Sequence, residues 1–150
     1  MYCQGMGFGT TTEDKNVFKF KKSANTAIPE ANREMKLAIF DTGTSFSMIP
    51  KTYWDAYTKQ IISSFKIENA QVVNGFFSFS CSERTKIQKL SFMFNGSWFE
   101  MDPNDFVFDA SEAQDSTTCA LAIVQNELEF FLLGNSFLRG YYSVHNPDLN

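Results

Sequence analysis

The sequence predicts a mainly β domain that carries only a few short helices. Three observations support this: apolar segments with period-two alternation recur along the chain, turn residues separate them, and helical periodicity is confined to one segment. The composition favours a packed core, because 43% of the 150 residues are hydrophobic and 17 are phenylalanine. A chain of this length is expected to form one domain with a sizeable buried interior.

The N-terminal part of the chain holds weak structural signals followed by one clear strand. Residues 1–16 are rich in Gly, Thr and charged residues, which is typical of a loop or of extended chain. Residues 17–21 alternate apolar and basic side chains and predict one strand. Residues 23–34 are polar, contain a proline and predict a loop. Residues 37–40 (Leu-Ala-Ile-Phe) predict a buried strand.

One amphipathic helix is predicted over residues 51–64. Pro50 suits the start of a helix, where its missing N–H group leaves no hydrogen bond unmade. Large apolar side chains then recur at helical spacing, at Trp54, Tyr57, Ile61 and Phe65. Such a stripe is typical of a helix that packs one face on the core.

The second half of the chain predicts further strands and a hairpin. Residues 75–81 alternate with period two and predict a strand. Residues 89–94 and 97–101 predict the two strands of a hairpin, because Asn95-Gly96 between them tolerates the positive φ angles of a type I′ turn. The remaining elements are a helical turn at 103–106 and short strands at 106–108, 121–124 and 130–133.

Charge and cysteine content exclude several classes of function. The formal net charge is −4, whereas nucleic-acid binding requires a basic patch, so nucleic acid is not expected as a partner. No run approaches 18 apolar residues, so no membrane span is predicted. One histidine, three cysteines and no Cys-x-x-Cys pair argue against a metal site. Taken alone, the odd cysteine count and the absence of a visible signal peptide favour reduced thiols.

The most informative motif is Asp41-Thr42-Gly43, directly after the strand predicted at residues 37–40. Gly43 lets the backbone turn where a side chain would clash, and the threonines can hydrogen-bond the acid or brace the turn. A carboxylate held at the end of a strand can activate water by general acid–base catalysis. The alternative is that Asp-Thr-Gly is only a turn in some other β protein.

A second motif runs from Phe130 to Val144 and contains Leu132-Leu133-Gly134, then Asn135-Ser136-Phe137-Leu138, then aromatic residues. Together with Asp-Thr-Gly-Thr-Ser at residues 41–45, it makes the chain resemble the C-terminal lobe of a pepsin-like aspartic protease. The resemblance covers roughly residues 37–146 and leaves residues 1–36 poorly matched. It implies one lobe of the pepsin-like double-psi β-barrel fold, formed by residues 37–150 and incomplete at its C-terminal end.

The resemblance also implies roles for individual residues. Asp41 is the expected catalytic carboxylate, with Thr42 hydrogen-bonding across the two lobes and Thr44 lying close to the acid. Substrate contact is implied for Ile39, Gly43, Thr44, Ser45 and Leu132. The segment 132–134 is expected to pack beneath the Asp-Thr-Gly turn. For Leu132 and Leu133, a plain core-strand role is the alternative to direct substrate contact.

Other positions acquire an interpretation from the same resemblance. Cys81 and Cys119 occupy the places of the lobe's disulfide, which leaves Cys3 over. Asn135 stands where the family commonly has aspartate, so one carboxylate near the cleft is missing. Asn95-Gly96-Ser97 is also a glycosylation sequon, although the turn alone explains the Asn and the Gly.

This family takes one catalytic aspartate from each of two lobes, and the chain contains one Asp-Thr-Gly. The sequence therefore predicts half of the site of an aspartic endopeptidase that acts on peptides and needs no cofactor. The chain alone is expected to be inactive without a partner. The partner would be a missing N-terminal lobe or a second copy of the chain. The alternative is a non-catalytic lobe that binds peptides or protein partners. The resemblance implies a secreted, lysosomal or vacuolar location, with any signal peptide upstream of Met1.

Overall fold

A computed structural model describes residues 1–9, 17–19, 35–110 and 117–144, without the side chains of residues 17–19 and of some positions in the main helix. In chain order the elements are β1 (Tyr2–Phe8), β2 (Val17–Lys19), β3 (Lys36–Phe40), β4 (Ser47–Pro50), α1 (Lys51–Phe65), β5 (Gln71–Val73), β6 (Phe76–Ser80), the 3-10 helix η3 (Cys81–Lys86), β7 (Leu90–Phe94), β8 (Ser97–Met101), α2 (Pro103–Phe106), β9 (Val107–Asp109), β10 (Thr118–Asn126), β11 (Phe130–Leu133) and α3 (Asn135–Leu138).

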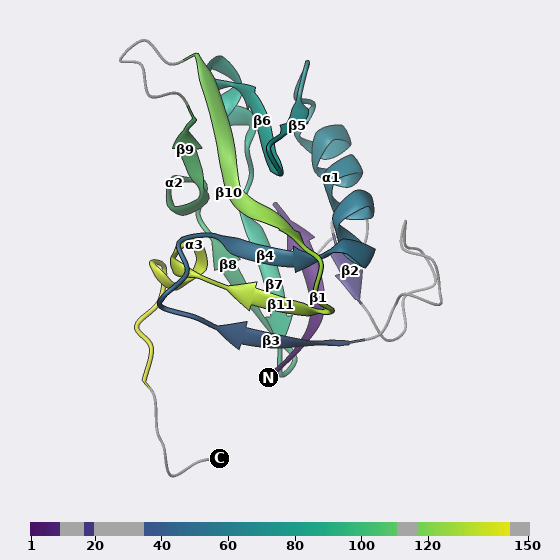
Figure 1. The fold of residues 1–150 in the computed structure, drawn as a ribbon, viewed down its shortest axis with the longest axis vertical. Helices are drawn as coiled ribbons and strands as arrows, with labels where there is room; N and C mark the ends of the chain where they lie inside the picture. Colours follow the sequence, from purple (N-terminus) through teal and green to yellow (C-terminus); the bar gives the residue numbers. More distant parts are fainter. Residues whose placement is uncertain (10–16, 20–34, 111–116, 145–150) are drawn as a thin grey trace.

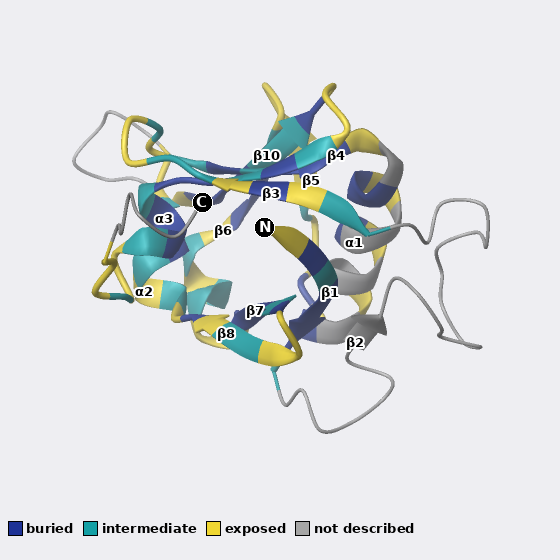
Figure 2. Ribbon diagram, turned by 90° about the horizontal axis from the view of Figure 1, so that it is seen from below, coloured by how far each residue is buried: buried dark blue, intermediate teal, exposed yellow. Residues whose placement is uncertain are grey.

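The strands of the described residues join into one sheet, so the mainly β prediction is confirmed. Its order is β5-β6-β10-β4-β11-β3-β1-β7-β8, with β2 paired to β1 and β9 paired to β10. Two pairs are parallel, β10 with β4 and β11 with β3, and the other pairs are antiparallel. The sheet curls, so that β3 and β4 lie across the molecule from β7 and β8 (Figures 1 and 2).

Three adjacent strands, β3, β11 and β4, carry both sequence motifs. Leu132 of β11 lies opposite Ile39 of β3 on one side and Met48 of β4 on the other. β3 ends at Phe40 and β11 ends at Leu133, and these two residues are paired. Because the strands run parallel and end together, the Asp-Thr-Gly turn and the segment after Leu133 emerge at the same edge of the sheet.

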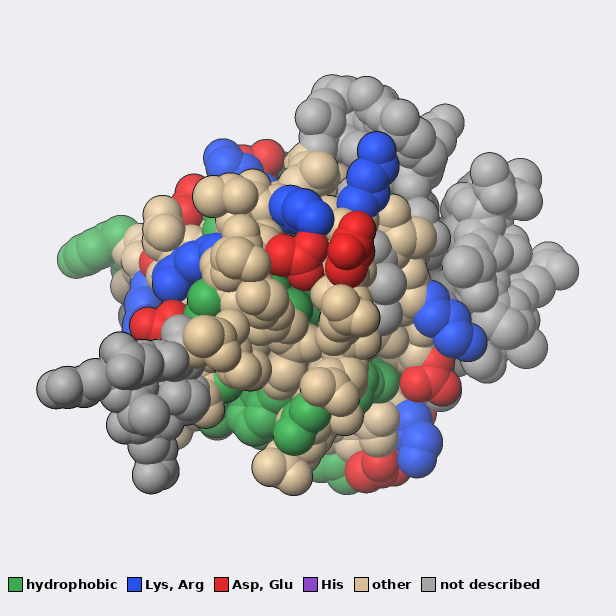
Figure 3. Space-filling model, turned by 90° about the horizontal axis from the view of Figure 1, so that it is seen from above, with side chains coloured by type: hydrophobic (Ala, Val, Ile, Leu, Met, Phe, Trp, Pro, Cys, Tyr) green, Lys and Arg blue, Asp and Glu red, His purple; other side chains and the backbone are tan. Residues whose placement is uncertain are grey.

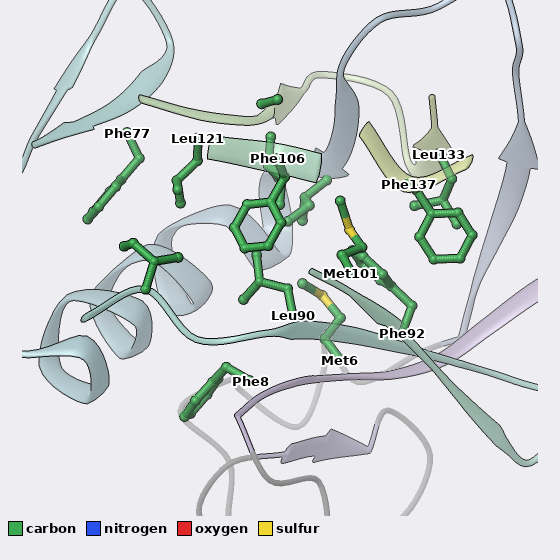
Figure 4. Packing of buried hydrophobic residues seen from close by; sticks show 14 of the residues in the cluster. Met6, Phe8, Phe77, Leu90, Phe92, Met101, Phe106, Leu121, Leu133 and Phe137 are labelled. Carbon is green, nitrogen blue, oxygen red and sulfur yellow. The ribbon is translucent and has the colours of Figure 1, made fainter. Parts of the chain in front are cut away.

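The core fills the inside of the curled sheet with aromatic and sulfur-containing side chains (Figure 4). Phe92 is fully buried and contacts Phe94, Phe131 and Phe137, with ring centroids 5.9 to 6.5 Å apart. Two of these four rings come from β7, one comes from β11 and the fourth comes from α3. Burial of a phenylalanine side chain contributes roughly 1.5–3 kcal/mol, so this cluster holds α3 against the sheet.

The helix predicted over residues 51–64 is confirmed as α1. Tyr53, Trp54 and Phe65 are buried, and the Tyr53 ring stacks on Phe131 with centroids 5.8 Å apart. The helix ends where Lys66 adopts a left-handed conformation with φ 52°. The side chains of Tyr57 and Ile61, which the helical stripe included, lie outside the described residues.

The hairpin prediction is confirmed, since β7 and β8 pair antiparallel around Asn95 and Gly96, whose φ angles are 48° and 79°. The predicted strands at residues 75–81, 106–108, 121–124 and 130–133 correspond to β6, β9, β10 and β11. The strand predicted at residues 17–21 is described only as β2, and the loop predicted at residues 23–34 lies outside the described residues.

Two expectations need correction. Residues 37–40 were expected to be buried, but within β3 Leu37 and Ile39 are 42% and 39% exposed while Ala38 is buried. An apolar run does not distinguish a strand buried on both faces from one whose second face is open. No pattern predicts β4, and residues 2–8, which were expected to be loop or extended chain, form β1 between β3 and β7.

The implied disulfide is present: Cys81 and Cys119 are bonded, with their Cα atoms 4.9 Å apart. It links the start of η3 to β10. Acidic and basic side chains are interspersed on the face in Figure 3, and the molecule's ion pairs include Arg84 with Asp109 and Lys89 with Glu100. No described helix combines the length and apolar character needed to cross a membrane.

Candidate active site

Asp41 is held at the point where β3 leaves the sheet. Its backbone N–H donates to the carbonyl oxygen of Leu133 at 3.0 Å, which extends the β3–β11 pairing by one residue. The N–H of Thr44 donates back to the Asp41 carbonyl at 3.4 Å and closes the turn. The strand pairing therefore fixes where the carboxylate stands, and the turn fixes its direction.

Both carboxylate oxygens of Asp41 accept a hydrogen bond from the same turn. The N–H of Gly43 donates to Oδ1 at 2.9 Å, and the hydroxyl of Thr44 donates to Oδ2 at 2.6 Å. These bonds favour the ionised form, so the Thr44 hydroxyl first and the Gly43 N–H second lower the pKa of Asp41 below its usual value of 3.8, against a small desolvation effect. The two donors therefore favour the carboxylate form of Asp41, which can accept a proton.

The segment Gly134–Ser136 lies directly on the turn. The N–H of Asn135 donates to the Thr44 carbonyl at 2.7 Å, and that of Ser136 donates to the Ser45 carbonyl at 3.1 Å. A Cβ atom on Gly134 would fall well inside 3.0 Å of the carbonyl oxygens of Phe46 and Thr44. The φ angle of Gly134 is −89°, which any residue can adopt. A glycine is required here because the two backbones approach closely.

The structure brings together most of the residues that the sequence singled out. Thr42, Gly43 and Ser45 are exposed on the turn, and Thr44 is half-buried against Asp41. Ile39 and Leu132 lie side by side on the outer face of the sheet, where Ile39 is exposed and Leu132 is half-buried. Their outward position differs from that of Leu133, which is fully buried. The core-strand alternative thus fits Leu133, whereas Leu132 is placed where an apolar ligand group can reach it.

An apolar pocket that the sequence analysis missed is lined in part by Phe46, the residue after Ser45. Its volume is about 450 Å³, within the range of small-ligand sites. Three half-buried phenylalanines form one wall with centroid separations of 5.1 to 5.9 Å: Phe46, Phe76 and Phe108. Polar rim residues include Gln71, Asn74 and Thr118. The available signal was the position of Phe46 directly after Ser45, but nothing local shows that three distant segments meet there.

The remaining candidates lie away from the turn. Asn95 is exposed at the tip of the β7–β8 hairpin, and Cys3 is fully buried in β1. Among the described residues, one group of potential metal ligands occurs, Cys81, Asp109 and Cys119, but the disulfide occupies both sulfur atoms.

Other aspartates have roles of their own in the described structure. The Asp102 carboxylate accepts from the N–H of Asn104 and caps α2, and Asp109 pairs with Arg84. Within residues 1–9, 17–19, 35–110 and 117–144, none of the other carboxylates hydrogen-bonds Asp41. Among the described residues, Asp41 is therefore not hydrogen-bonded to a second carboxyl group.

Comparison with known proteins places these features in a family. The family model for eukaryotic aspartyl proteases matches residues 10–150. Vacuolar protease A of Arthroderma otae is 31% identical over 108 residues, covering 72% of this chain and 25% of that protein. Gastricsin of Macaca fuscata fuscata is 29% identical over 119 residues, covering 75% of this chain and 29% of that protein. The chain thus spans between a quarter and a third of the length of these relatives.

Proposed function

Because this chain belongs to the eukaryotic aspartyl protease family, we propose that it supplies one carboxylate, Asp41, to an aspartic endopeptidase site. The observation that carries the proposal is the pair of hydrogen bonds from Gly43 and Thr44 to the two carboxylate oxygens. They favour the ionised form of Asp41 and hold its side chain in place at the end of β3. An ionised carboxylate in this position can accept a proton from water as the water attacks a peptide carbonyl carbon.

The reaction needs a second carboxyl group. When two carboxyl groups lie close together they share one proton, because two like charges at short distance raise the pKa of one group. The protonated group then donates to the carbonyl oxygen while Asp41 takes the proton of water. We propose that the second group comes from another lobe or from a second copy of this chain, and that the monomeric chain does not cleave peptides.

The substrate we propose is a peptide with apolar side chains near the cleaved bond. Ile39 and Leu132 present an apolar surface next to the turn, and Phe46 carries that apolar character into the 450 Å³ pocket. We propose that Gly43, Thr44 and Ser45 contact the peptide backbone, because Gly43 and Ser45 are exposed on the turn and Thr44 lies half-buried between them. Apolar contacts of this kind set the preference for side chains, while hydrogen bonds orient the backbone.

We place the protein in a vacuolar or secretory compartment. Two observations support this: several relatives are named as vacuolar proteases, and disulfides such as Cys81–Cys119 persist in oxidising compartments. Asn95 of the glycosylation sequon is exposed in a turn, as the attachment of a glycan requires.

The proposal is tested with the purified chain and a mixture of apolar peptides from pH 2 to 7, alongside sedimentation equilibrium. We expect no cleavage where the chain is monomeric. Cleavage that grows with the square of chain concentration and disappears in Asp41→Asn would identify a second copy as the partner. Cleavage by the monomer would refute the need for a partner, and cleavage that persists in Asp41→Asn would refute the role of Asp41.

The same experiment separates the non-catalytic alternative. In that case the peptides bind with equal Kd to wild-type chain and to Asp41→Asn. In that case neither the purified chain nor the protein isolated from its own cells cleaves the peptides at any pH.

A further inference from the structure

Asn135 contacts the turn that carries Asp41 in two ways. Its backbone N–H donates to the Thr44 carbonyl at 2.7 Å, and its side-chain amide donates to the Thr42 carbonyl at 3.3 Å. The side chain is half-buried at the start of α3. The backbone contact follows from the close packing of residues 134–136, but the side-chain contact depends on the carboxamide itself.

The Thr42 carbonyl and the Gly43 N–H are the two polar ends of one peptide group. The described peptide bonds are all trans, so these two ends point in opposite directions from a rigid plane. The carbonyl end accepts from Asn135, and the N–H end donates to Oδ1 of Asp41 at 2.9 Å. The three groups therefore form a continuous chain of hydrogen bonds from the Asn135 amide to the Asp41 carboxylate.

From this chain of contacts we infer that Asn135 is a positioning residue, whose carboxamide holds the Thr42–Gly43 peptide so that its N–H points at Asp41. Hydrogen bonds linked in series polarise one another, so a donor on the carbonyl also strengthens the N–H as a donor. The inference rests on the proposed function in one respect, the assignment of Asp41 as the catalytic carboxylate. It assigns a role in the site to Asn135, a residue that acts on Asp41 through the backbone and not through contact with substrate.

The identity of the side chain matters at this position. A carboxylate in place of the Asn135 amide could not donate to the Thr42 carbonyl when ionised, and it would add a negative charge near Asp41. Both changes disfavour the ionised form of Asp41. The amide supplies the donor without a charge.

The readout is the ionisation of Asp41, followed by NMR on the isotopically labelled chain from pH 2 to 8. The Asp41 side-chain carbon reports its pKa, and the Gly43 amide reports the hydrogen bond. In the described part of the structure the influences on this carboxyl are the Thr44 hydroxyl, the Gly43 N–H and weak desolvation, with no charged neighbour. His145 lies outside the described residues, so its own titration is recorded in the same spectra.

The matched control is Asn126→Ala, the same substitution near the opposite end of β11. The Asn126 amide donates to the Phe130 carbonyl at 3.0 Å, and its carbonyl accepts from Leu128, so it braces the β10–β11 turn without touching Asp41. We expect Asn135→Ala to raise the pKa of Asp41 and Asn135→Asp to raise it further. Asn126→Ala should lower the melting temperature and leave that pKa at its wild-type value.

Equal Asp41 pKa values in wild type, Asn135→Ala and Asn126→Ala would overturn the inference. A measurement on the wild-type chain decides the matter if the variants do not fold. The Asn135 side-chain amide resonances should shift with the same midpoint as the Asp41 carboxyl, and their failure to do so would also overturn it. These NMR measurements need no catalysis. They can contradict the role of Asn135 while Asp41 proves essential for cleavage, and they can support the role of Asn135 while Asp41 proves dispensable for cleavage.

Discussion

Replacing Gly134 with alanine should destabilise the chain more than any other glycine-to-alanine change in the turn region. The added Cβ would lie well inside 3.0 Å of two backbone oxygens, those of Thr44 and Phe46, and 3.0 Å from the Thr44 carbonyl carbon. Backbone atoms cannot rotate away as a flexible side chain can. The turn and the start of α3 must therefore separate.

The expected cost follows from that separation. Forcing an extra methyl group into a packed site costs about 1–3 kcal/mol. The movement also weakens the bonds from Asn135 to Thr44 and from Ser136 to Ser45, each worth roughly 0.5–1.5 kcal/mol. We expect a loss of about 2–6 kcal/mol in the free energy of unfolding, which for a chain of this size lowers the melting temperature by about 4–24 °C.

The assay is urea unfolding monitored by fluorescence, with Gly140→Ala as the control. At Gly140 the nearest atoms to an added Cβ are 3.8 Å away and φ is not positive, so alanine fits there and stability should change by less than about 1 kcal/mol. If Gly134→Ala and Gly140→Ala unfold at the same urea concentration, the close packing of residues 134–136 on the turn is wrong.

Three further predictions concern ionisation and covalent structure. Thr44→Val removes the main hydrogen-bond donor to Asp41, and this donor depresses the pKa of Asp41 in the folded state. The variant should therefore show its full loss of stability above about pH 4, and the loss should vanish as the pH falls through the depressed pKa. A stability difference that is constant from pH 2 to 7 would contradict this. Burial raises the pKa of the Cys3 thiol to about 12, so iodoacetamide at pH 8 should label Cys3 only after the chain unfolds. Rapid labelling of the native chain, measured by mass spectrometry, would contradict the burial of Cys3 in β1. Removing the disulfide with Cys81→Ala and Cys119→Ala together should cost about 4 kcal/mol for a loop of 38 residues, and a denaturation midpoint equal to that of the oxidised chain would contradict this.

Local patterns in the sequence predicted the elements that local chemistry determines. The β7–β8 hairpin follows from Asn95-Gly96, whose positive φ angles few other residue pairs accept. The helix α1 follows from its apolar stripe and from Pro50 before it. The position of Asp41 after a strand also follows from the motif, and the resemblance to a known family supplied the expectation that residues 132–134 lie beneath the turn.

Features that depend on distant parts of the chain could not be predicted. β1 contains Gly5 and Gly7, which weaken its strand pattern, and its burial comes from pairing with β3 and β7. The aromatic wall of Phe46, Phe76 and Phe108 joins three separate segments. The link from Asn135 to Asp41 passes through a peptide group, and a backbone carbonyl leaves no mark on the sequence.

The most direct test of the central claim, that Asp41 is half of a water-activating carboxyl pair, is the pH profile of kcat/KM for the protein in the form that its cells accumulate. Wild type should give a bell-shaped profile with two acidic apparent pKa values that belong to the pair. Asp41→Asn should lose activity by at least about 10²–10⁴-fold across the profile. Activity of Asp41→Asn within tenfold of wild type, with the same profile, would contradict the claim.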